Sequence, residues 1–420
     1  MKSYARYKDS GISWIGEIPE HWEISRIRHL FVESDEKTSD AAETLLSLSQ
    51  YTGVSLKSES PKLGMFEAET TEGYKIVHKG QFVMNIMLAW NGSYAVSNLD
   101  GVISPAYCVF DFVKDCEKWY FHYLLRLKVY SGAFKTLSKG IIDSRLRLYP
   151  NKFYTFPVII PPIEEQKAIA VYLDNKTEQI NHLVAAKQKQ IELLKEYKQS
   201  LIANAVTKGI NSKVKMKDSG ISWIGNVPEH WQFMRAKYMF KKEKRDVRNN
   251  DEVVTCFRDG EVTLRKNRRT TGFTESLTEI GYQGIRKNDL VIHQMDAFAG
   301  AIGVSDSDGK GTSVYHCCTP LGNYNVFYYA FLLRVMAKKG FIQSLYRGIR
   351  ERSSDFNFLV FGKQYLAIPP IDEQKQIVAY INERVSSIDT QISSIEKQIA
   401  NLNEYKQSLI SDVVTGKVRV

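Results

Sequence analysis

The sequence predicts an α+β protein in which two duplicated mixed α/β domains are separated by two long helices that form an antiparallel coiled coil. Three observations predict this fold. The chain of 420 residues contains a long internal repeat, each repeat ends in a long helical pattern, and the sequence between the repeated ends has diverged. Apolar residues make up 43% and charged residues 25% of the chain, so each domain can bury a core of its own.

The internal repeat is the strongest of these signals. Residues 8–16 (Lys-Asp-Ser-Gly-Ile-Ser-Trp-Ile-Gly) recur unchanged at residues 217–225, and a Pro-Glu-His-Trp sequence follows each copy. A Pro-Pro-Ile junction and a Glu-Tyr-Lys-Gln-Ser-Leu-Ile sequence also occur once in each repeat. A period of this length indicates duplication of a whole module rather than a solenoid of small units. We therefore expect domains at 1–160 and 211–368 and long helices at 161–210 and 369–420.

Each repeat ends in a coiled-coil pattern. Apolar side chains recur every three or four residues for more than four heptads in the second repeat, and the first repeat shows the same stripe with Lys187 and Thr177 at two of its positions. The stripe also includes Tyr197 and Tyr405. Such a stripe needs a partner, and the two helices of this chain are the obvious pair; association of two copies through the same stripe is the alternative. The predicted interface residues are Ile169, Leu173, Ile180, Val184, Ile191, Leu194, Leu201, Ile377, Ile381, Ile388, Ile392, Ile395, Ile399, Leu402 and Leu409.

Positive charge is concentrated at the same place in both modules. Segments 126–147 and 334–352 each carry six basic residues and one acidic residue. Arginine and lysine neutralise phosphates, and arginine also donates two hydrogen bonds to guanine. The coincidence predicts contact with DNA; a solvated helix face is the alternative, and the basic stretches 241–245 and 265–269 are further candidates. The predicted DNA-binding residues are Lys135, Lys139, Arg145, Arg147, Arg347, Arg350 and Arg352, with Trp90, Asn91 and Asp296 from the glycine-rich stretch of each module.

The length of the predicted helices has a consequence for such a contact. Forty residues at about 1.5 Å each make a rod of roughly 60 Å. Because half-sites on DNA are spaced by turns of about 34 Å, a rigid pair of helices would hold the modules one to two turns apart. We interpret the helices as a ruler between two half-sites.

No motif of catalysis, cofactor binding or metal binding is apparent. The eight histidines are dispersed, residues 303–310 lack the spacing of a phosphate loop, and no glycine fingerprint follows a predicted strand. The five scattered cysteines indicate neither a zinc site nor a disulfide framework, which favours a reducing cytoplasm. The N-terminus lacks the apolar core of a signal peptide, and no apolar stretch is long enough to span a membrane. We expect a cytoplasmic protein with no enzyme activity, no cofactor, no metal and no membrane contact.

The repeated motifs resemble those of the specificity subunits of type I restriction-modification systems. The resemblance lies in the Asp-Ser-Gly-Ile-x-Trp-Ile-Gly-x-Ile/Val-Pro-x-x-Trp opening, the Ile-Pro-Pro-Ile-x-Glu-Gln junction and the Glu-Tyr-Lys-x-Ser-Leu-Ile end, and it covers essentially the whole chain. It implies two target recognition domains that each read one half of a split site in double-stranded DNA, and a coiled coil that sets the unspecified gap. It also implies two methyltransferase subunits as partners, to which restriction subunits can be added.

With this resemblance we expect a non-catalytic, sequence-specific DNA-binding subunit that directs methyltransferase and restriction subunits to a bipartite target. The alternative is a protein-protein scaffold with no DNA readout, which would not need matching basic segments in both modules. A nuclease or methyltransferase activity in this chain would require a metal-carboxylate cluster or a cofactor loop, and the sequence shows neither.

Overall fold

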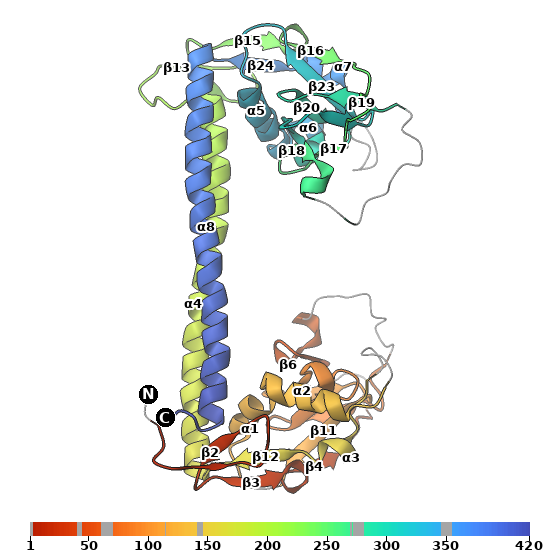
Figure 1. Cartoon of the computed structure of the whole chain (residues 1–420), viewed down its shortest axis with the longest axis vertical. Helices are drawn as coiled ribbons and strands as arrows, with labels where there is room; N and C mark the ends of the chain where they lie inside the picture. Colours follow the sequence, from red (N-terminus) through yellow and green to blue (C-terminus); the bar gives the residue numbers. More distant parts are fainter. Residues whose placement is uncertain are drawn as a thin grey trace. The chain divides into compact units, whose positions relative to one another are not determined.

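The computed structural model describes residues 3–39, 44–59, 70–113, 115–140, 146–268, 271, 281–345 and 355–420. The chain forms two compact units. Unit 1 consists of Met1–Gln188 and Glu396–Val420, and unit 2 consists of Lys189–Ile395. Each unit therefore contains one mixed α/β domain and one half of each long helix, α4 (Ile163–Lys208) and α8 (Ile371–Val414) (Figure 1).

The domain of unit 1 is built on a four-stranded antiparallel sheet with the strand order β4-β11-β8-β9, and the ribbons β1-β2, β5-β6, β7-β10 and β3-β12 complete it (Figure 1). The strands are β1 (Tyr7–Asp9), β2 (Glu17–Pro19), β3 (Glu23–Arg26), β4 (Phe31–Ser34), β5 (Leu46–Ser49), β6 (Gly53–Leu56), β7 (Lys75–Val77), β8 (Phe82–Asn85), β9 (Tyr94–Val96), β10 (Gly101–Ile103), β11 (Tyr107–Phe112) and β12 (Pro157–Ile160). The helices are α1 (Lys118–Leu125), α2 (Lys128–Leu137) and α3 (Pro150–Phe153), with short 3-10 turns η1 (Ile27–His29), η2 (Lys57–Glu59) and η3 (Ala89–Asn91).

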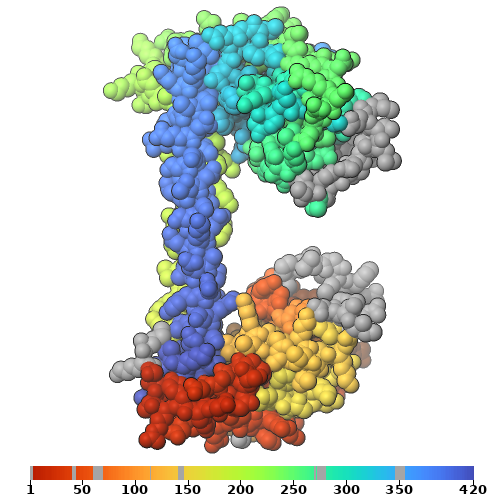
Figure 2. Space-filling view, in the orientation of Figure 1, coloured from red at the N-terminus to blue at the C-terminus, as the bar shows by residue number. Residues whose placement is uncertain are grey.

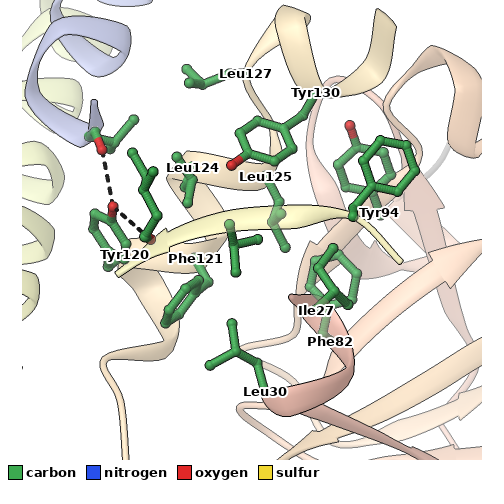
Figure 3. Close-up of a cluster of buried hydrophobic side chains, with 14 of the residues drawn as sticks. Ile27, Leu30, Phe82, Tyr94, Tyr120, Phe121, Leu124, Leu125, Leu127 and Tyr130 are labelled. Atoms are coloured by element: carbon green, nitrogen blue, oxygen red, sulfur yellow. Dashed lines mark hydrogen bonds between the residues drawn. The ribbon is translucent and has the colours of Figure 1, made fainter. Parts of the chain in front are cut away.

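Both faces of this central sheet are buried, because successive side chains of a strand point to opposite faces. On β8, Phe82 and Met84 enter the main core together with α1 and α2. Val83, between them, enters a smaller core that the β5-β6 and β7-β10 ribbons cover. Figure 3 shows Phe82 and Tyr94 from the sheet among the aromatic and leucine side chains of the two helices. The sheet is thus the middle layer between helices and ribbons.

The domain of unit 2 repeats this plan, with the strand order β16-β23-β20-β21 in its central sheet. Adjacent Cys317 and Cys318 point to the two opposite cores, as strand alternation predicts, and both are fully buried. The strands are β13 (Met216–Asp218), β14 (Asn226–Pro228), β15 (Gln232–Arg235), β16 (Phe240–Glu243), β17 (Val254–Cys256), β18 (Val262–Leu264), β19 (Gln283–Ile285), β20 (Leu290–His293), β21 (Ile302–Val304), β22 (Gly309–Gly311), β23 (Tyr315–Pro320) and β24 (Tyr365–Ile368). The helices are α5 (Val326–Lys338), α6 (Phe341–Ser344) and α7 (Phe358–Lys363), with 3-10 turns η5 (Ala236–Tyr238), η6 (Arg265–Asn267) and η7 (Ala297–Ala299).

In each unit the two helix halves run side by side in opposite directions (Figure 1). In unit 1, Lys187 Nζ donates a hydrogen bond of 2.5 Å to Gln398, and Lys406 Nζ donates one of 2.9 Å to Asn181. The residue numbers of these partners increase along α4 as they decrease along α8, so the two helices are antiparallel. In unit 2, Lys198 makes an ion pair of 2.6 Å with Asp389.

The side chains of the predicted stripe are buried or half-buried along both helices. Ile169, Leu173, Ile377 and Ile381 are the most deeply buried, with exposed fractions of 1% or less. Tyr197 and Tyr405 are exceptions: both were assigned to the stripe, and both are more than half exposed, so their phenol groups remain in water. Lys187, which interrupts the stripe, lies at its edge and reaches Gln398 across the pair.

Both ends of the chain belong to unit 1. The Tyr7 hydroxyl donates to the Gly416 carbonyl oxygen at 3.3 Å, and a Cβ on Gly416 would lie 2.4 Å from Pro19. Figure 2 shows the N-terminal residues, in red, packed against the last turns of α8, in blue. The first strands of the chain therefore enclose the end of its last helix.

Candidate nucleic-acid interface

A tight turn between β8 and β9 brings two predicted DNA-binding residues together in unit 1. Trp90 lies on η3, where its indole N–H donates to the Met87 carbonyl oxygen at 3.0 Å, and Gly92 ends the turn in the left-handed region with φ of 98°. Helix α2 packs against this turn. The Lys135 ammonium lies 5.1 Å from the centre of the Trp90 ring, within the range of a cation–π interaction. Asn91 follows Trp90 on η3, and its side-chain amide oxygen accepts a hydrogen bond of 3.3 Å from the Ser93 hydroxyl.

Two further predicted residues are joined to the same turn through the backbone. Lys139 and Arg147 exchange two backbone hydrogen bonds of 2.9 Å, which close a short antiparallel bridge. The next backbone N–H, that of Leu148, donates to the Ile86 carbonyl oxygen at 2.9 Å. The exposed Lys139 and half-buried Arg147 therefore lie beside the β8-β9 turn. Arg145, predicted in the same segment, lies outside the described residues.

The equivalent turn of unit 2 has a different chemistry. Asp296 precedes η7, and its carboxylate accepts a hydrogen bond of 2.9 Å from Arg258, which lies in the turn between β17 and β18. Phe298, in place of the tryptophan, packs against the main core. The predicted residues Arg347, Arg350 and Arg352 lie outside the described residues. In unit 2, Asp296 is therefore the only predicted DNA-binding residue that lies within the described part of the chain.

Some of the charge in the two basic segments has a structural role instead. Arg126 is mostly buried and donates to the carbonyl oxygens of Tyr94 at 2.7 Å and Gln50 at 2.8 Å. Burial lowers its pKa and also that of Arg334, its counterpart in α5, which packs against Gly260. Lys339 donates to a backbone carbonyl oxygen at 2.8 Å. The surplus of positive charge at the surface is thus smaller than the sequence count suggested.

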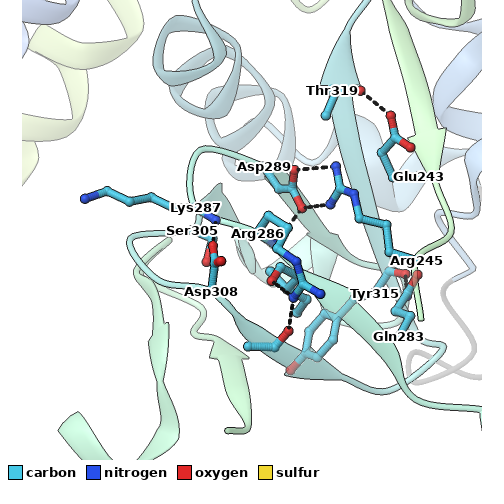
Figure 4. Close-up of polar contacts among 12 residues, drawn as sticks. Glu243, Arg245, Gln283, Arg286, Lys287, Asp289, Ser305, Asp308, Tyr315 and Thr319 are labelled. Carbon is cyan, nitrogen blue, oxygen red and sulfur yellow. Dashed lines mark hydrogen bonds and ion pairs between the residues drawn. The ribbon is translucent and has the colours of Figure 1, made fainter. Parts of the chain in front are cut away.

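Arg245, in the candidate basic stretch 241–245, is likewise part of the scaffold. Its guanidinium donates to both carboxylate oxygens of Asp289, whose side chain is almost fully buried (Figure 4). Arg286 makes a second ion pair, of 3.0 Å, with buried Asp251. A buried carboxylate requires such a partner because an unpaired charge is costly away from water. These ion pairs give Arg245 and Arg286 a structural role that requires no contact with DNA.

The repeated motifs meet where each domain joins a long helix. Near the start of α4, Glu165 accepts hydrogen bonds from the Trp22 indole at 3.0 Å and the Tyr4 hydroxyl at 2.8 Å, and it contacts the His21 ring at 2.7 Å. Unit 2 repeats this joint around α8 with Glu373, Trp231 and His230. We call these two clusters the joints. They explain why the Pro-Glu-His-Trp and Pro-Pro-Ile motifs recur together.

A buried tyrosine in each domain holds the end of the other long helix within its unit. The Tyr120 hydroxyl donates to the carbonyl oxygens of Val414 at 3.0 Å and Ile159 at 3.3 Å (Figure 3). In unit 2, the Tyr328 hydroxyl donates to the Val206 carbonyl oxygen at 2.8 Å. Carbonyl groups in the last turn of a helix lack partners within the helix, so these tyrosines act as side-chain caps.

Comparison with known proteins finds similarity to type I restriction specificity subunits. No family model matches the chain. The chain is 27% identical over 229 residues to the type I restriction enzyme MjaVIII specificity subunit of Methanocaldococcus jannaschii, covering 52% of this chain and 49% of the relative. It is 23% identical over 325 residues to the putative type I restriction enzyme MjaX specificity subunit of that organism, covering 72% and 69%. The type I restriction enzyme EcoKI specificity subunit of Escherichia coli is 22% identical over 349 residues, covering 76% and 68%.

Solved structures agree on the fold over almost the whole chain. The HsdS subunit of Thermoanaerobacter tengcongensis superposes with a TM-score of 0.55 at 14% identity, covering 96% of this chain and 98% of the other. A chain from a structure of type I R-M system assembly and conformational transition superposes with a TM-score of 0.67, also at 14% identity, covering 96% and 99%.

The chain is thus similar, in sequence and in fold, to type I specificity subunits.

These similarities bear out the resemblance to type I specificity subunits that the motifs predicted. The alignments cover between about half and just over two thirds of the curated relatives. Among the described residues, no group of three or more histidine, cysteine or acidic side chains could hold a metal ion. In the part of the chain that the structure describes, no helix is long and apolar enough to cross a membrane.

Arg258, which pairs with Asp296, was not among the site residues predicted from the sequence. The residue lies in a diverged segment, apart from the basic runs that were counted. One local signal was available: Arg258 precedes Asp259-Gly260, and an Asp-Gly pair between two short apolar runs is typical of a β-hairpin turn. The structure shows that turn between β17 and β18, beside Asp296.

Proposed function

We propose that this chain is the DNA-recognition subunit of a type I restriction-modification complex. Each domain, at 1–160 and 211–368, is a target recognition domain that reads one half of a bipartite site in double-stranded DNA. The helices at 161–210 and 369–420 set the number of unspecified bases between the halves. The chain binds two methyltransferase subunits, and restriction subunits with them, and so directs their chemistry to the site.

The observation that carries this proposal is a shared scaffold with different turns. The central sheets of the two domains have the same strand order, and the joints use the same residue types. The β8-β9 turn and its counterpart nevertheless present Trp90 with Lys135 in one domain and Asp296 with Arg258 in the other. One scaffold that displays two chemistries is suited to one task on two different targets.

The long helices support the role of a spacer. Helix α4 has 46 residues and α8 has 44. At about 1.5 Å per residue, each helix is roughly 65–70 Å long, about two turns of DNA. A helix pair with a continuous apolar seam is stiff, so its length can define a distance. We propose that insertion of four residues near Leu194 lengthens the unspecified gap, and an unchanged gap in an assembled complex would exclude this role.

The proposed contact residues are Lys135, Lys139, Arg145, Arg147, Trp90 and Asn91 in the first domain and Arg347, Arg350, Arg352 and Asp296 in the second. Lys139 and Arg147 are the clearest candidates for phosphate contacts, because their bridge holds both beside the turn. Replacing both with alanine should weaken binding to all sequences alike and reduce the slope of log K against log salt by about 2. Unchanged binding would remove them from the interface.

Methylome sequencing tests the function directly. Cells that carry this chain with an expressed methyltransferase of the same system are compared with cells that lack only this chain. A split motif with two short half-sites, methylated only when the chain is present, is the expected result. No new motif, with the methyltransferase shown to be active, would favour the protein-protein scaffold and overturn DNA recognition.

A further inference from the structure

We infer that Arg258, oriented by Asp296, reads a guanine in the half-site of the second domain. This inference rests on the proposed function, and it assigns a base-reading role to a residue outside the predicted basic segments. Five observations on unit 2 and its counterpart carry it: the contact between two turns, the fixed backbone of Asp296, the exposure of the guanidinium, the local charge balance, and the residue at the same place in the first domain.

The β17-β18 turn and the η7 turn lie in direct contact. A Cβ on Gly300 would lie 2.7 Å from the Arg258 carbonyl oxygen, so only glycine fits at the point where the turns meet. Gly300 also has φ of 98°, a left-handed backbone that favours glycine. The β17-β18 turn is closed by the Phe257 N–H, which donates to the Glu261 carbonyl oxygen at 2.8 Å. The backbone that carries Arg258 is therefore held from both sides.

The backbone of Asp296, whose carboxylate meets Arg258, is itself fixed. The Asp296 backbone N–H donates to His293 Nδ1 at 3.0 Å, and the Asp296 carbonyl oxygen accepts from Ala299 at 3.0 Å. His293 can accept because burial lowers its pKa, which favours the neutral ring, and it packs edge-on against Tyr315 at 5.1 Å. The backbone of Asp296 is thus held in place, and Arg258 Nη2 donates to its carboxylate at 2.9 Å.

The guanidinium keeps most of its donors available. The Arg258 side chain is 67% exposed, and among the described residues its guanidinium makes no other hydrogen bond. Arginine has five N–H donors in a planar fork, so those left over can meet a pair of acceptors. The O6 and N7 atoms of guanine are such a pair in the major groove, and arginine on guanine is the commonest specific contact in protein–DNA complexes.

The charge around Arg258 favours a base edge over a phosphate. Asp296 neutralises Arg258, and neighbouring Arg268 is neutralised by Asp259 and Glu261 at 2.8 Å each. Arg334, which packs against Gly260 of the same turn, is a third arginine. Three arginines and three carboxylates leave no positive excess at this turn to attract phosphate, since that attraction depends on net charge. Hydrogen bonds to an uncharged base edge depend on direction, and the planar guanidinium, oriented by its bond to Asp296, supplies direction.

The first domain has a different side chain at this place. Gly92 corresponds to Gly300, with the same φ of 98°, and a Cβ on Gly92 would lie 3.9 Å from the Gln50 Cβ. Gln50 lies in the β5-β6 turn, as Arg258 lies in the β17-β18 turn. Glutamine pairs with adenine where arginine pairs with guanine. The position shared by Gln50 and Arg258 is therefore one at which two domains of one scaffold would select different bases.

The test is selection from a random duplex DNA library by the full chain assembled with its methyltransferase, followed by sequencing. The variants are Arg258→Ala, Arg258→Lys and Asp296→Asn. The matched control is Arg248→Ala, because Arg248 is 63% exposed and makes a similar pair of 3.0 Å with Asp308. Arg258 lies on an exposed turn, so thermal unfolding should be the same for wild type and all variants.

We expect Arg258→Ala to lose its preference for one guanine in one half-site by about 5- to 150-fold, with the other half-site and the salt slope unchanged. Arg258→Lys should recover only part of the preference because it lacks the fork, and Asp296→Asn should weaken the same position. The Arg248→Ala motif should equal the wild-type motif.

Three results would overturn the inference. One is an Arg258→Ala motif identical to wild type. Another is uniformly weaker binding with a reduced salt slope, which would identify a phosphate contact. The last is a wild-type motif without guanine in the affected half. A wild-type complex that selects no motif at all would instead overturn the proposed function, and with it this assignment.

Discussion

The two domains agree at their joints and differ at their turns. In both joints a glutamate near the start of a long helix accepts from a buried tryptophan and contacts a histidine. Where the turns meet, the first domain has Gln50 and Trp90 and the second has Arg258 and Asp296. Each joint links a domain to the start of a long helix, so both joints can use the same residue types. The turns are free to differ because the sheet beneath them is already complete.

Breaking a joint should have the largest effect. Trp22 and Trp231 are fully buried, so Trp22→Ala or Trp231→Ala should lower the free energy of unfolding by about 3–5 kcal/mol. Denaturant titration gives the size of the loss, and hydrogen exchange should place it in unit 1 for Trp22→Ala and in unit 2 for Trp231→Ala. If either variant loses less than about 1 kcal/mol, the joints do not hold the domains to the helices.

The tyrosine caps should come next. Tyr120→Phe removes the donor to two buried carbonyl oxygens and should cost about 1–3 kcal/mol, and Tyr328→Phe should cost a similar amount. Tyr130→Phe is the control, because the Tyr130 hydroxyl is buried without a partner among the described residues. Its removal should be neutral or stabilising. Equal losses of stability in Tyr120→Phe and Tyr130→Phe would show that the hydrogen bond to the end of the helix does not contribute to the free energy of unfolding.

Acid should weaken both domains through buried histidines, His122 in the first domain and His293 and His316 in the second. Burial and the charge of Arg126 lower the pKa of His122 to about 3, and burial and Lys242 lower that of His316 to about 4. The unfolded chain takes up these protons near pH 6.5 and the folded chain does not. The contribution of each histidine to the free energy of unfolding is therefore fully present above pH 6.5. Below pH 6.5 it falls by about 1.4 kcal/mol per pH unit for each histidine. Denaturant titrations between pH 7.5 and 5 should show this slope, and His316→Gln should reduce it; a slope of the opposite sign would contradict the assignment.

The smallest effect concerns the turn of the first domain. Gln50→Ala should relax base preference in the half-site that Arg258→Ala leaves unchanged, by about 1 kcal/mol, because no carboxylate among the described residues orients the Gln50 side chain as Asp296 orients Arg258. Library selection with the assembled complex measures it. A change in the same half-site for both variants would show that the domains do not read independently.

Much of the fold could be predicted because it is encoded in repeated residues. The identical openings identified the duplication, and the spacing of Ile377, Ile381 and Ile388 predicted a helix with one buried face, which the structure shows. The resemblance to type I specificity subunits also followed from these motifs. Tyr197 and Tyr405 were misassigned because helical spacing alone does not reveal where the partner helix leaves a side chain in water.

The site was harder to predict because it depends on contacts between segments distant in sequence. Counting charge could not separate Arg126, which donates to backbone carbonyl oxygens, from Lys139, which is exposed. Arg258 and Asp296 meet across 38 positions of diverged sequence, and no periodicity links them. Only the tertiary contact between two turns, made possible by Gly300, indicates that they work together.

The discontinuity of unit 1 has a consequence for synthesis. Unit 2 is one continuous segment, Lys189–Ile395, whereas unit 1 needs Glu396–Val420 to be complete. At about 5–20 residues per second, the ribosome delivers that last segment roughly ten to fifty seconds after the first domain has emerged. Until then Tyr120 has no Val414 carbonyl oxygen to bind, and the face of α4 that α8 will cover is open. The domain that is made first is thus completed last. During this interval the apolar face of α4 is not yet covered by α8 and must not bind other proteins.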